Sequence, residues 1–247
     1  MTRSEAHELI QTNNYFGSMM VRMGDADGFI AGLTQHYPDT IRPALQVIGM
    51  KPGVRRVSGL YVLATKKEVY FFADTTVNIE PSAEDLAEIA LLAAGVARDF
   101  NFEPRVAMIS FSNFGSTKHP LAEKVANAVE IVKRTNPKLI VDGEMQADTA
   151  VVPEIIKEDY PFSTLKGGAN VLIFPSLESA NAAYKLMMRI GGAEALGPIL
   201  MGMNQPVHVL QRGAEVEEIV NMASIAVVHA QMNAVEKAAR KKTSSAA

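Results

Sequence analysis

Short apolar segments alternate with amphipathic segments along most of this 247-residue chain, and this alternation restricts the fold more than any other feature. Residues 105–111, 139–141 and 171–174 are apolar runs of the kind found in buried parallel strands. Helices are expected at residues 121–134 and 179–190, the first with a clearly amphipathic pattern. The alternation predicts an α/β protein with a three-layer α/β/α fold and a mostly parallel sheet.

One pair of segments predicts an antiparallel element within that sheet. Residues 57–65 and 68–73 have the composition of two strands joined by a short turn, which is typical of a hairpin. The clearest helix begins at Ser82, with Asp85 completing its cap, and runs to about Phe100. Further helices are expected at residues 15–23, at 39–48 with Asp39 as the cap, and at 215–228, and further strands at 26–32 and 198–201. The sheet is therefore expected to be mixed.

Composition excludes several classes of protein and site. The chain has no Cys, which removes disulfides, zinc–cysteine sites, iron–sulfur ligation and thiolate nucleophiles. Its 24 Lys+Arg and 27 Asp+Glu are dispersed, whereas nucleic-acid binding requires a basic stripe. No apolar run approaches the ~18 residues that span a bilayer, and the first residues lack a secretory signal pattern. We expect a soluble cytoplasmic protein that binds neither nucleic acid nor membrane.

The common nucleotide and metal motifs are absent. The sequence contains neither G-x-G-x-x-G after a strand nor G-x-x-x-x-G-K-[ST]. The histidines show no H-E-x-x-H spacing, and they are expected at surface or loop positions: His7, His36, His119, His208 and His229. No metal site is expected in this chain.

One loop between a strand and a helix is a candidate anion site. Its polar and small residues are Ser110, Ser112, Asn113, Gly115 and Ser116. Such a loop offers hydroxyls and free backbone amides, and the dipole of the following helix adds positive potential. An ordinary polar turn has the same composition, so both interpretations stay open.

Two arginines near expected helix starts are further candidates. Arg42 offers a guanidinium fork for phosphate oxygens, although pairing with Asp39 is an equal alternative. Arg212 and Gly213 precede a helix that begins with acidic residues, among them Glu218. An arginine with a carboxylate one turn away suits anion binding and proton abstraction. A solvated helix end whose charges match the dipole explains the same residues.

Three acidic residues follow another expected strand. Asp142, Glu144 and Asp148 lie after its carboxyl end, where open α/β sheets place ligands. They suggest a cation site, but helix capping and turn formation explain two of them equally well.

A family resemblance depends on several segments considered together. They are residues 25–28 (DADG), 39–46 (DTIRPALQ), 104–108 (PRVAM), 181–185 (NAAYK), 197–200 (GPIL) and 212–221 (RGAEVEEIVN). Together they resemble the phosphate acetyl/butyryl transferase family over about residues 15–231. Residues 141–150 and 221–228 are closer still to the phosphotransacetylase-like C-terminal domain of bacterial multidomain NADP-dependent malic enzymes.

The resemblance implies a fold and a domain organisation. It implies two α/β lobes with a cleft, similar to isocitrate and isopropylmalate dehydrogenases. Residues 1–247 would form one phosphotransacetylase-like domain, with a second lobe at about 50–200, a first lobe from 1–49 plus 201–235, and a polar tail at 236–247. The initial βα portion of full-length phosphotransacetylases is missing from the pattern, so we expect a piece of a longer protein.

Two departures from the family pattern shape the functional hypothesis. Transferases of this family typically have serine where Gln211 stands and an aspartate, regarded as the base for the coenzyme A thiol, where Glu218 stands. Both positions are read as degenerate, which favours binding without turnover. The hypothesis is therefore a regulatory domain of a malic enzyme that binds acetyl-CoA as an effector and lowers malic-enzyme activity. Its expected ligand-binding residues are Arg42, Ser110, Ser112, Asn113, Gly115, Ser116, Arg212 and Gly213.

The same hypothesis implies partners, and two other functions stay open. NADP and a divalent metal are expected only in an absent malic-enzyme catalytic domain, which would be the partner in the full-length chain. The alternative function is an active phosphate acetyltransferase that exchanges acetyl between CoA and phosphate. A third is an oligomerisation module with a vestigial cleft.

The last expected helix also predicts self-association. It carries more apolar residues than one core face requires: Met222, Ala223, Ile225, Ala226, Val228 and Ala230. The resembling family pairs through helices, so a homo-oligomer of at least two copies is expected.

Overall fold

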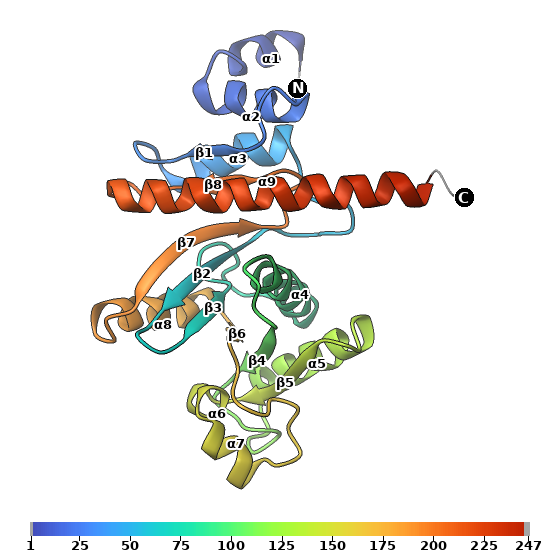
Figure 1. Ribbon diagram of the computed structural model, residues 1–247, viewed down its shortest axis with the longest axis vertical. Coiled ribbons are helices and arrows are strands. Elements are labelled where there is room, and N and C mark those ends of the chain that lie inside the picture. The colour runs from blue at the N-terminus through green and yellow to red at the C-terminus, as the bar shows by residue number, and fades with distance from the viewer. Residues whose placement is uncertain (1, 245–247) are drawn as a thin grey trace. The chain divides into compact units, whose positions relative to one another are not determined.

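The computed structural model describes the backbone of residues 2–244 and the side chains of residues 2–235. The chain divides into two compact units, which are described separately below. Unit 1 comprises Met1–Val57 and Pro198–Ala247, and unit 2 comprises Ser58–Gly197. Figure 1 shows the elements of both units, coloured by residue number.

Unit 2 is built on a six-stranded sheet. The strand order is β5-β4-β6-β3-β2-β7, where β4 pairs in parallel with β5 and β6, and β6 with β3, while β2 and β3 are antiparallel. The strands are β2 (Ser58–Ala64), β3 (Val69–Ala73), β4 (Arg105–Ile109), β5 (Ile140–Met145), β6 (Val171–Ile173) and β7 (Glu194–Met201). The predicted mixed α/β fold with a mostly parallel sheet is confirmed, including the hairpin.

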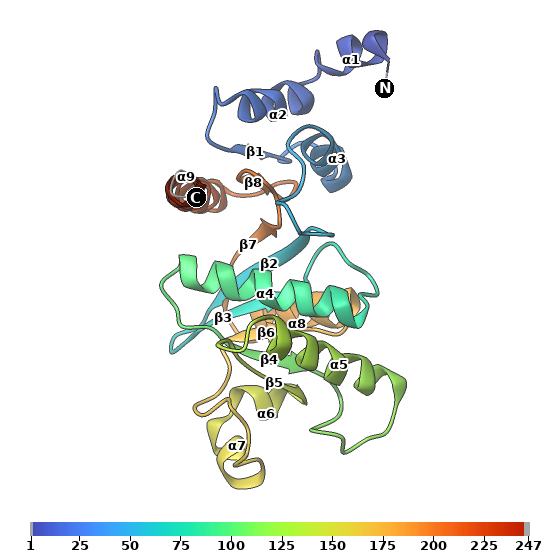
Figure 2. The same cartoon turned by 90° about the vertical axis from the view of Figure 1, so that its right-hand side faces the viewer.

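Helices cover both faces of this sheet. They are α4 (Ala83–Asp99), α5 (Pro120–Thr135), α6 (Ala147–Val151), α7 (Pro153–Asp159) and α8 (Leu177–Arg189). Figure 1 shows α4 and α5 on one side and α6 and α8 on the other, and Figure 2 shows α4 crossing the sheet. Because both faces are covered, Phe71, Leu172 and Ile173 are all buried, which explains why the strands are continuously apolar.

Two helices of unit 2 were not expected from the sequence. α6 and α7 have five and seven residues, too few to show a helical period. They are separated at Val152 by Pro153, which begins the second of them. The expected helix after Ser82 is confirmed, with a reciprocal cap in which Asp85 N donates to Ser82 Oγ and Ser82 N donates to Asp85 Oδ2 (3.2 and 3.1 Å).

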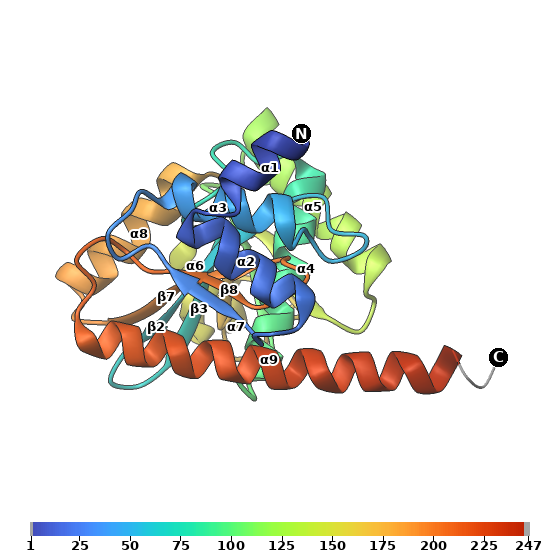
Figure 3. The ribbon, with the colours of Figure 1, turned by 90° about the horizontal axis from the view of Figure 1, so that it is seen from above.

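The described residues of unit 1 form a parallel strand pair and four helices. β1 pairs with β8, Ile30 lying opposite His208. The elements are α1 (Arg3–Leu9), α2 (Asn13–Met23), β1 (Phe29–Ala31), α3 (Tyr37–Val47), β8 (Val207–Val209) and α9 (Val216–Ser244). Figure 3 shows α2, α3 and α9 around the β1–β8 pair.

Three expectations for unit 1 are wrong. β8 lies in a segment that was read as a loop, because it has only three residues and a histidine at its centre. The N-cap of α3 is His36 and not Asp39, since the helix begins at Tyr37 with a proline in its first turn. The last helix does not end near Val228 but runs to Ser244, so most of the expected polar tail is helical; residues 245–247 lie outside the described part.

Half of the α9 residues that the sequence suggested as surplus apolar surface are buried. Met222, Ile225 and Ala226 are buried in unit 1, so they belong to its core and are not surplus apolar surface. Ala223 is exposed, and Val228 and Ala230 are partly buried. The three buried residues therefore do not argue for self-association, but Val220, Val227 and Met232 on the same helix are exposed, and self-association stays a prediction. Among the described helices, none combines the length and the apolarity needed to cross a membrane.

Two histidines lie in the core of unit 1, contrary to the expected surface or loop positions. His208 on β8 is fully buried, and its ring centroid lies 5.1 Å from that of His229 on α9. Within the described residues, both ring nitrogens of His208 and Nε2 of His229 lack a hydrogen-bond partner. Burial lowers the pKa of His208 to about 3, with a smaller contribution from His229. Burial, with the nearby charge of Lys51, lowers the pKa of His229 to about 4.

Candidate active site

In unit 2, a buried glutamate organises the loop between β4 and α5. Glu144 Oε1 accepts hydrogen bonds from Ser112 Oγ (2.9 Å) and from the amide of Gly115 (2.6 Å). Its carbonyl accepts from the amide of Phe114 (2.8 Å). Phe114 and Gly115 both have positive φ, and this turn directs the Phe114 amide to the Glu144 carbonyl and the Gly115 amide to the Glu144 carboxylate. The Glu144 carboxylate therefore takes the place of an outside anion at two donors of the loop, Ser112 Oγ and the Gly115 amide.

The other amides of this loop are also satisfied internally. The amide of Asn113 donates to Ser116 Oγ (3.0 Å), and the amide of Thr117 donates to Ser112 Oγ (3.1 Å). The amide of Ser112 donates to Ser110 Oγ (3.3 Å). The expectation of free backbone amides is therefore wrong for these residues. A ligand at this loop would meet exposed groups such as the side chain of Ser116.

We expect Glu144→Gln to lower the free energy of unfolding by about 1–2 kcal/mol. The amide oxygen of glutamine can still accept, but it replaces charge-assisted bonds with neutral ones of about half the strength. Urea unfolding would measure the loss, with Glu154→Gln on the exposed surface of α7 as the matched control. Faster hydrogen exchange at the Gly115 amide should accompany it. Equal stability of the two variants would contradict the assigned role of Glu144.

Asp142 and Glu144 lie within β5 and not after its end as expected, because the strand continues to Met145. Asp142 and Asp148 have local structural roles. Asp142 accepts from Lys133 Nζ (3.2 Å), Ser163 Oγ (2.9 Å) and the amide of Thr164 (2.8 Å). Asp148 accepts from the amide of Thr149 (2.9 Å). Within the part of the chain that the structure describes, no three His, Asp or Glu side chains are placed to hold a metal ion. The cation-site interpretation of this acidic segment is therefore not supported.

A second buried carboxylate of unit 2 was missed in the sequence. Asp74 follows β3, and its two oxygens accept from the amides of Gly59, Thr76, Val77 and Asn78 at 2.8–3.1 Å and from Asn78 Nδ2 at 2.5 Å. The side chain is 2% exposed. The sequence signal for this carboxylate was an Asp-x-x-x-Asn pattern after an apolar strand. The pattern alone does not show that the Asp74 side chain is buried, because that depends on Gly59 of β2 lying next to it.

In unit 1, the candidate arginines follow the two parallel strands. Because β1 and β8 are parallel, the segments that follow them leave at the same edge of the pair. The two segments are in contact there, since the amide of Gly213 donates to the carbonyl of Leu33 (3.4 Å). Arg42 lies in the second turn of α3, and Arg212 lies just before α9. Both side chains are exposed. Among the described residues Arg42 makes no ion pair with Asp39, so its guanidinium is available to a ligand. The edge therefore combines two arginines with the positive ends of helices, an arrangement suited to anions.

The carboxylate of Glu218 is partly engaged at the start of α9. Its Oε2 accepts from the amide of Glu215 (2.8 Å), which is a helix-capping contact. This contact supports the interpretation of the acidic residues as a dipole-matched helix end. Only one oxygen of the carboxylate makes this bond. Gln211, one residue before Arg212, lies in the same connection between β8 and α9.

Comparison with known proteins identifies the family. A family model described as phosphate acetyl/butaryl transferase matches residues 1–227. The chain belongs to this family. The phosphate acetyltransferase of Bacillus subtilis (strain 168) is 48% identical over 229 residues, covering 93% of this chain and 71% of the relative.

Two solved structures of the family agree with this assignment. The EutD phosphotransacetylase from Staphylococcus aureus superposes with a TM-score of 0.88 at 43% identity, covering 93% of this chain and 71% of the other. A phosphotransacetylase from Streptococcus pyogenes gives a TM-score of 0.88 at 43% identity, covering 94% and 70%. The expected transferase-family resemblance is therefore confirmed.

The malic-enzyme hypothesis is wrong. The relatives that are 43–48% identical over most of the chain are named phosphate acetyltransferase or phosphotransacetylase. The regulatory function, the oxidoreductase assignment and the malic-enzyme partner domain are overturned by the same finding. Similarity of residues 141–150 and 221–228 to malic enzymes was given more weight than the family pattern of the whole chain.

Proposed function

We propose that the protein is a phosphate acetyltransferase, which exchanges an acetyl group between coenzyme A and phosphate. The observation that carries the proposal is 48% identity, over 93% of the chain, to a phosphate acetyltransferase. The anion-suited edge of unit 1 supports it, because both substrates carry phosphate groups. The isocitrate dehydrogenase-like arrangement of two lobes stays a prediction.

The proposed reaction needs two kinds of group. A phosphate oxygen attacks the thioester carbonyl of acetyl-CoA, the carbon–sulfur bond breaks, and the thiolate takes up a proton to give CoA and acetyl phosphate. Arg42 and Arg212 would hold phosphate oxygens through charge-assisted hydrogen bonds. Ser110, Asn113, Ser116 and Gly213 remain proposed ligand-binding residues, whereas Ser112 and Gly115 would act by holding the loop through Glu144. In the reverse direction a base removes the thiol proton, and Glu218 stands where the resembling transferases have the aspartate regarded as that base.

The first test is phosphate-dependent turnover. Protein, acetyl-CoA and phosphate are mixed, and the release of free thiol is followed; we expect more than about 1 s⁻¹, the low end of ordinary enzymes. The Gln211→Ser, Glu218→Asp double variant has the residues typical of the resembling transferases. We expect its turnover to be at least as fast as that of the natural sequence. If only this double variant were active, the proposal would fail for the natural sequence.

A second test addresses the arginine. Arg212→Ala should lower kcat/KM by about 10- to 100-fold, because a charge-assisted bond to phosphate contributes about 1.5–3 kcal/mol. Folding should be little affected, since the side chain is exposed. Arg3→Ala, on the exposed helix α1, is the matched control and should keep full activity. Equal rates for both variants would remove Arg212 from the proposed site.

A further inference from the structure

A polar pocket of about 350 Å³ lies in unit 2 at the amino ends of the parallel strands of the sheet. The loop at residues 110–117 lies at their carboxyl ends. The pocket is lined where β3, β4 and β6 begin, whereas that loop follows the end of β4. The five residues of β4 span roughly 16 Å, so the pocket is separate from the loop. Nothing in the proposed transfer reaction uses it.

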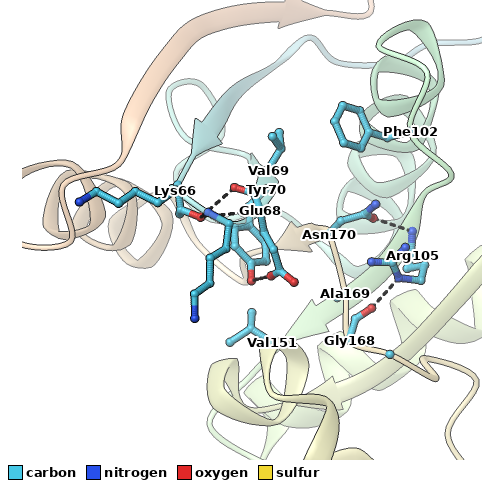
Figure 4. Close-up of a pocket in the computed structure, with 13 residues that line it drawn as sticks. Lys66, Glu68, Val69, Tyr70, Phe102, Arg105, Val151, Gly168, Ala169 and Asn170 are labelled. Carbon is cyan, nitrogen blue, oxygen red and sulfur yellow. Dashed lines mark hydrogen bonds between the residues drawn. The ribbon is translucent and has the colours of Figure 1, made fainter.

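One wall of the pocket holds an arginine in a fixed position. Arg105 Nε donates to the carbonyl of Gly168 (2.7 Å). Asn170 holds the backbone of Arg105 through two hydrogen bonds. The side-chain Oδ1 of Asn170 accepts from the Arg105 backbone amide (2.8 Å), and the backbone amide of Asn170 donates to the Arg105 carbonyl (3.1 Å). Figure 4 shows Arg105, Gly168 and Asn170 grouped on this side. Within the described residues, the terminal guanidinium nitrogens have no partner, and they form the planar fork that binds oxyanions.

The opposite wall is the turn between β2 and β3, which carries two lysines. Thr65 Oγ1 accepts from the amides of Lys67 (3.3 Å) and Glu68 (3.0 Å), and the amide of Thr65 donates to the carbonyl of Glu68 (2.9 Å). These bonds hold the turn from which Lys66 and Lys67 extend, and both lysines line the pocket. In Figure 4 the side chain of Lys66 points away from Arg105, so it has to rotate to reach a ligand beside Arg105.

The charge balance of the pocket is positive. Lys66, Lys67 and Arg105 supply three cations, and Glu68 supplies one carboxylate, which accepts a hydrogen bond from the hydroxyl of Tyr70. Burial, reinforced by Glu68, raises the pKa of Tyr70 to about 12, so the phenol stays protonated and adds no negative charge. A small ligand with at least two negative charges would be attracted to this pocket.

We propose that this pocket binds a small oxyanion ligand, with Arg105 as the fixed fork and the long, rotatable side chains of Lys66 and Lys67 as a second cationic group that turns toward the ligand. A phosphate or a dicarboxylate presents the required chemistry. Its volume matches a small metabolite and is too small to enclose a whole coenzyme A molecule. The site is separate from the proposed transfer reaction and does not depend on it.

The test is a titration followed by NMR on the ¹⁵N-labelled protein. One arm uses pyrophosphate and the other uses succinate, which distinguishes a phosphate from a carboxylate ligand. We expect saturable shifts of the amides at residues 65–68 and 167–170 in at least one arm. The Lys66→Gln, Lys67→Gln double variant should weaken that binding about tenfold. It leaves the turn intact, since only backbone groups and Thr65 hold it.

Two further variants complete the test. Arg105→Lys keeps the charge but loses the fork, and it should also weaken binding. Lys138→Gln, an exposed lysine that does not line the pocket, should bind like the natural sequence. All three variants should retain the basal transferase rate. The proposal is overturned if neither probe shifts these amides, or if the double lysine variant and Arg105→Lys bind as tightly as Lys138→Gln.

Discussion

Replacing Asp74 with alanine is expected to lower the free energy of unfolding by about 4–6 kcal/mol. Its carboxylate accepts five hydrogen bonds, four from backbone amides and one from Asn78 Nδ2. Removing it leaves these donors in a region closed to solvent, and each buried donor without a partner costs about 1–3 kcal/mol. Asp74→Asn should give an intermediate loss, because one oxygen remains to accept.

Chemical denaturation would measure this effect, with Asp148→Ala as the matched control. Asp148 is exposed, and its carboxylate accepts only from the amide of Thr149 among the described residues, so its loss should cost less than about 1 kcal/mol. If Asp74→Ala does not fold, Asp74→Asn still tests the idea. Stability of Asp74→Asn equal to that of the natural protein would show that the carboxylate does not hold this segment.

Acidification should destabilise unit 1 strongly because of the buried histidine pair. In the unfolded chain both imidazoles take up protons near pH 6.5, whereas in the folded chain the pKa of His208 is about 3 and that of His229 about 4. The folded state therefore binds fewer protons below pH 6.5. The stability that depends on the neutral rings is complete above pH 6.5 and is lost as the pH falls toward 3. At pH 4.5 each histidine should cost about 2–3 kcal/mol relative to pH 7.

The measurement compares unfolding free energies at pH 7 and pH 4.5 among variants. In His208→Leu the difference between the two pH values should be smaller than in the natural protein by about 2–3 kcal/mol, and in His229→Gln by a similar amount. His36→Gln, at the exposed N-cap of α3, should keep the full difference. Because carboxylates titrate alike in all these proteins, the comparison isolates the imidazoles. A pH difference that is the same in His208→Leu and His36→Gln would refute the prediction.

Local signals in the sequence were sufficient for the longer elements of both units. The period of apolar residues between Ser82 and Phe100 predicted α4, and the apolar runs predicted β3, β4 and β6. These signals are reliable because a helix or strand must present its apolar side chains to a core at its own repeat. α6, α7 and β8 were missed because a few residues cannot display a repeat.

Functional residues were recognised by type but not by partner. The Ser- and Gly-rich loop after β4 was singled out as an anion site, yet its amides donate to Glu144 and to serine hydroxyls of the loop itself. Glu144 itself was read as a possible cation ligand, since nothing in the sequence shows that two parallel strands place it beside Ser112. The family pattern identified a transferase relative, whereas two short segments misdirected the functional hypothesis to malic enzymes.

The sequence by itself determined the α/β class, the order of the main strands and helices, and the transferase family. These properties depend on local patterns and on the identity of residues along the chain. Only the tertiary structure decided which polar groups are buried and what each of them contacts. Asp74 reaches the amide of Gly59, Arg105 reaches the carbonyl of Gly168, and His208 lies beside His229. Each pair is far apart in the chain, and the pairing of strands and the packing of helices bring its members together.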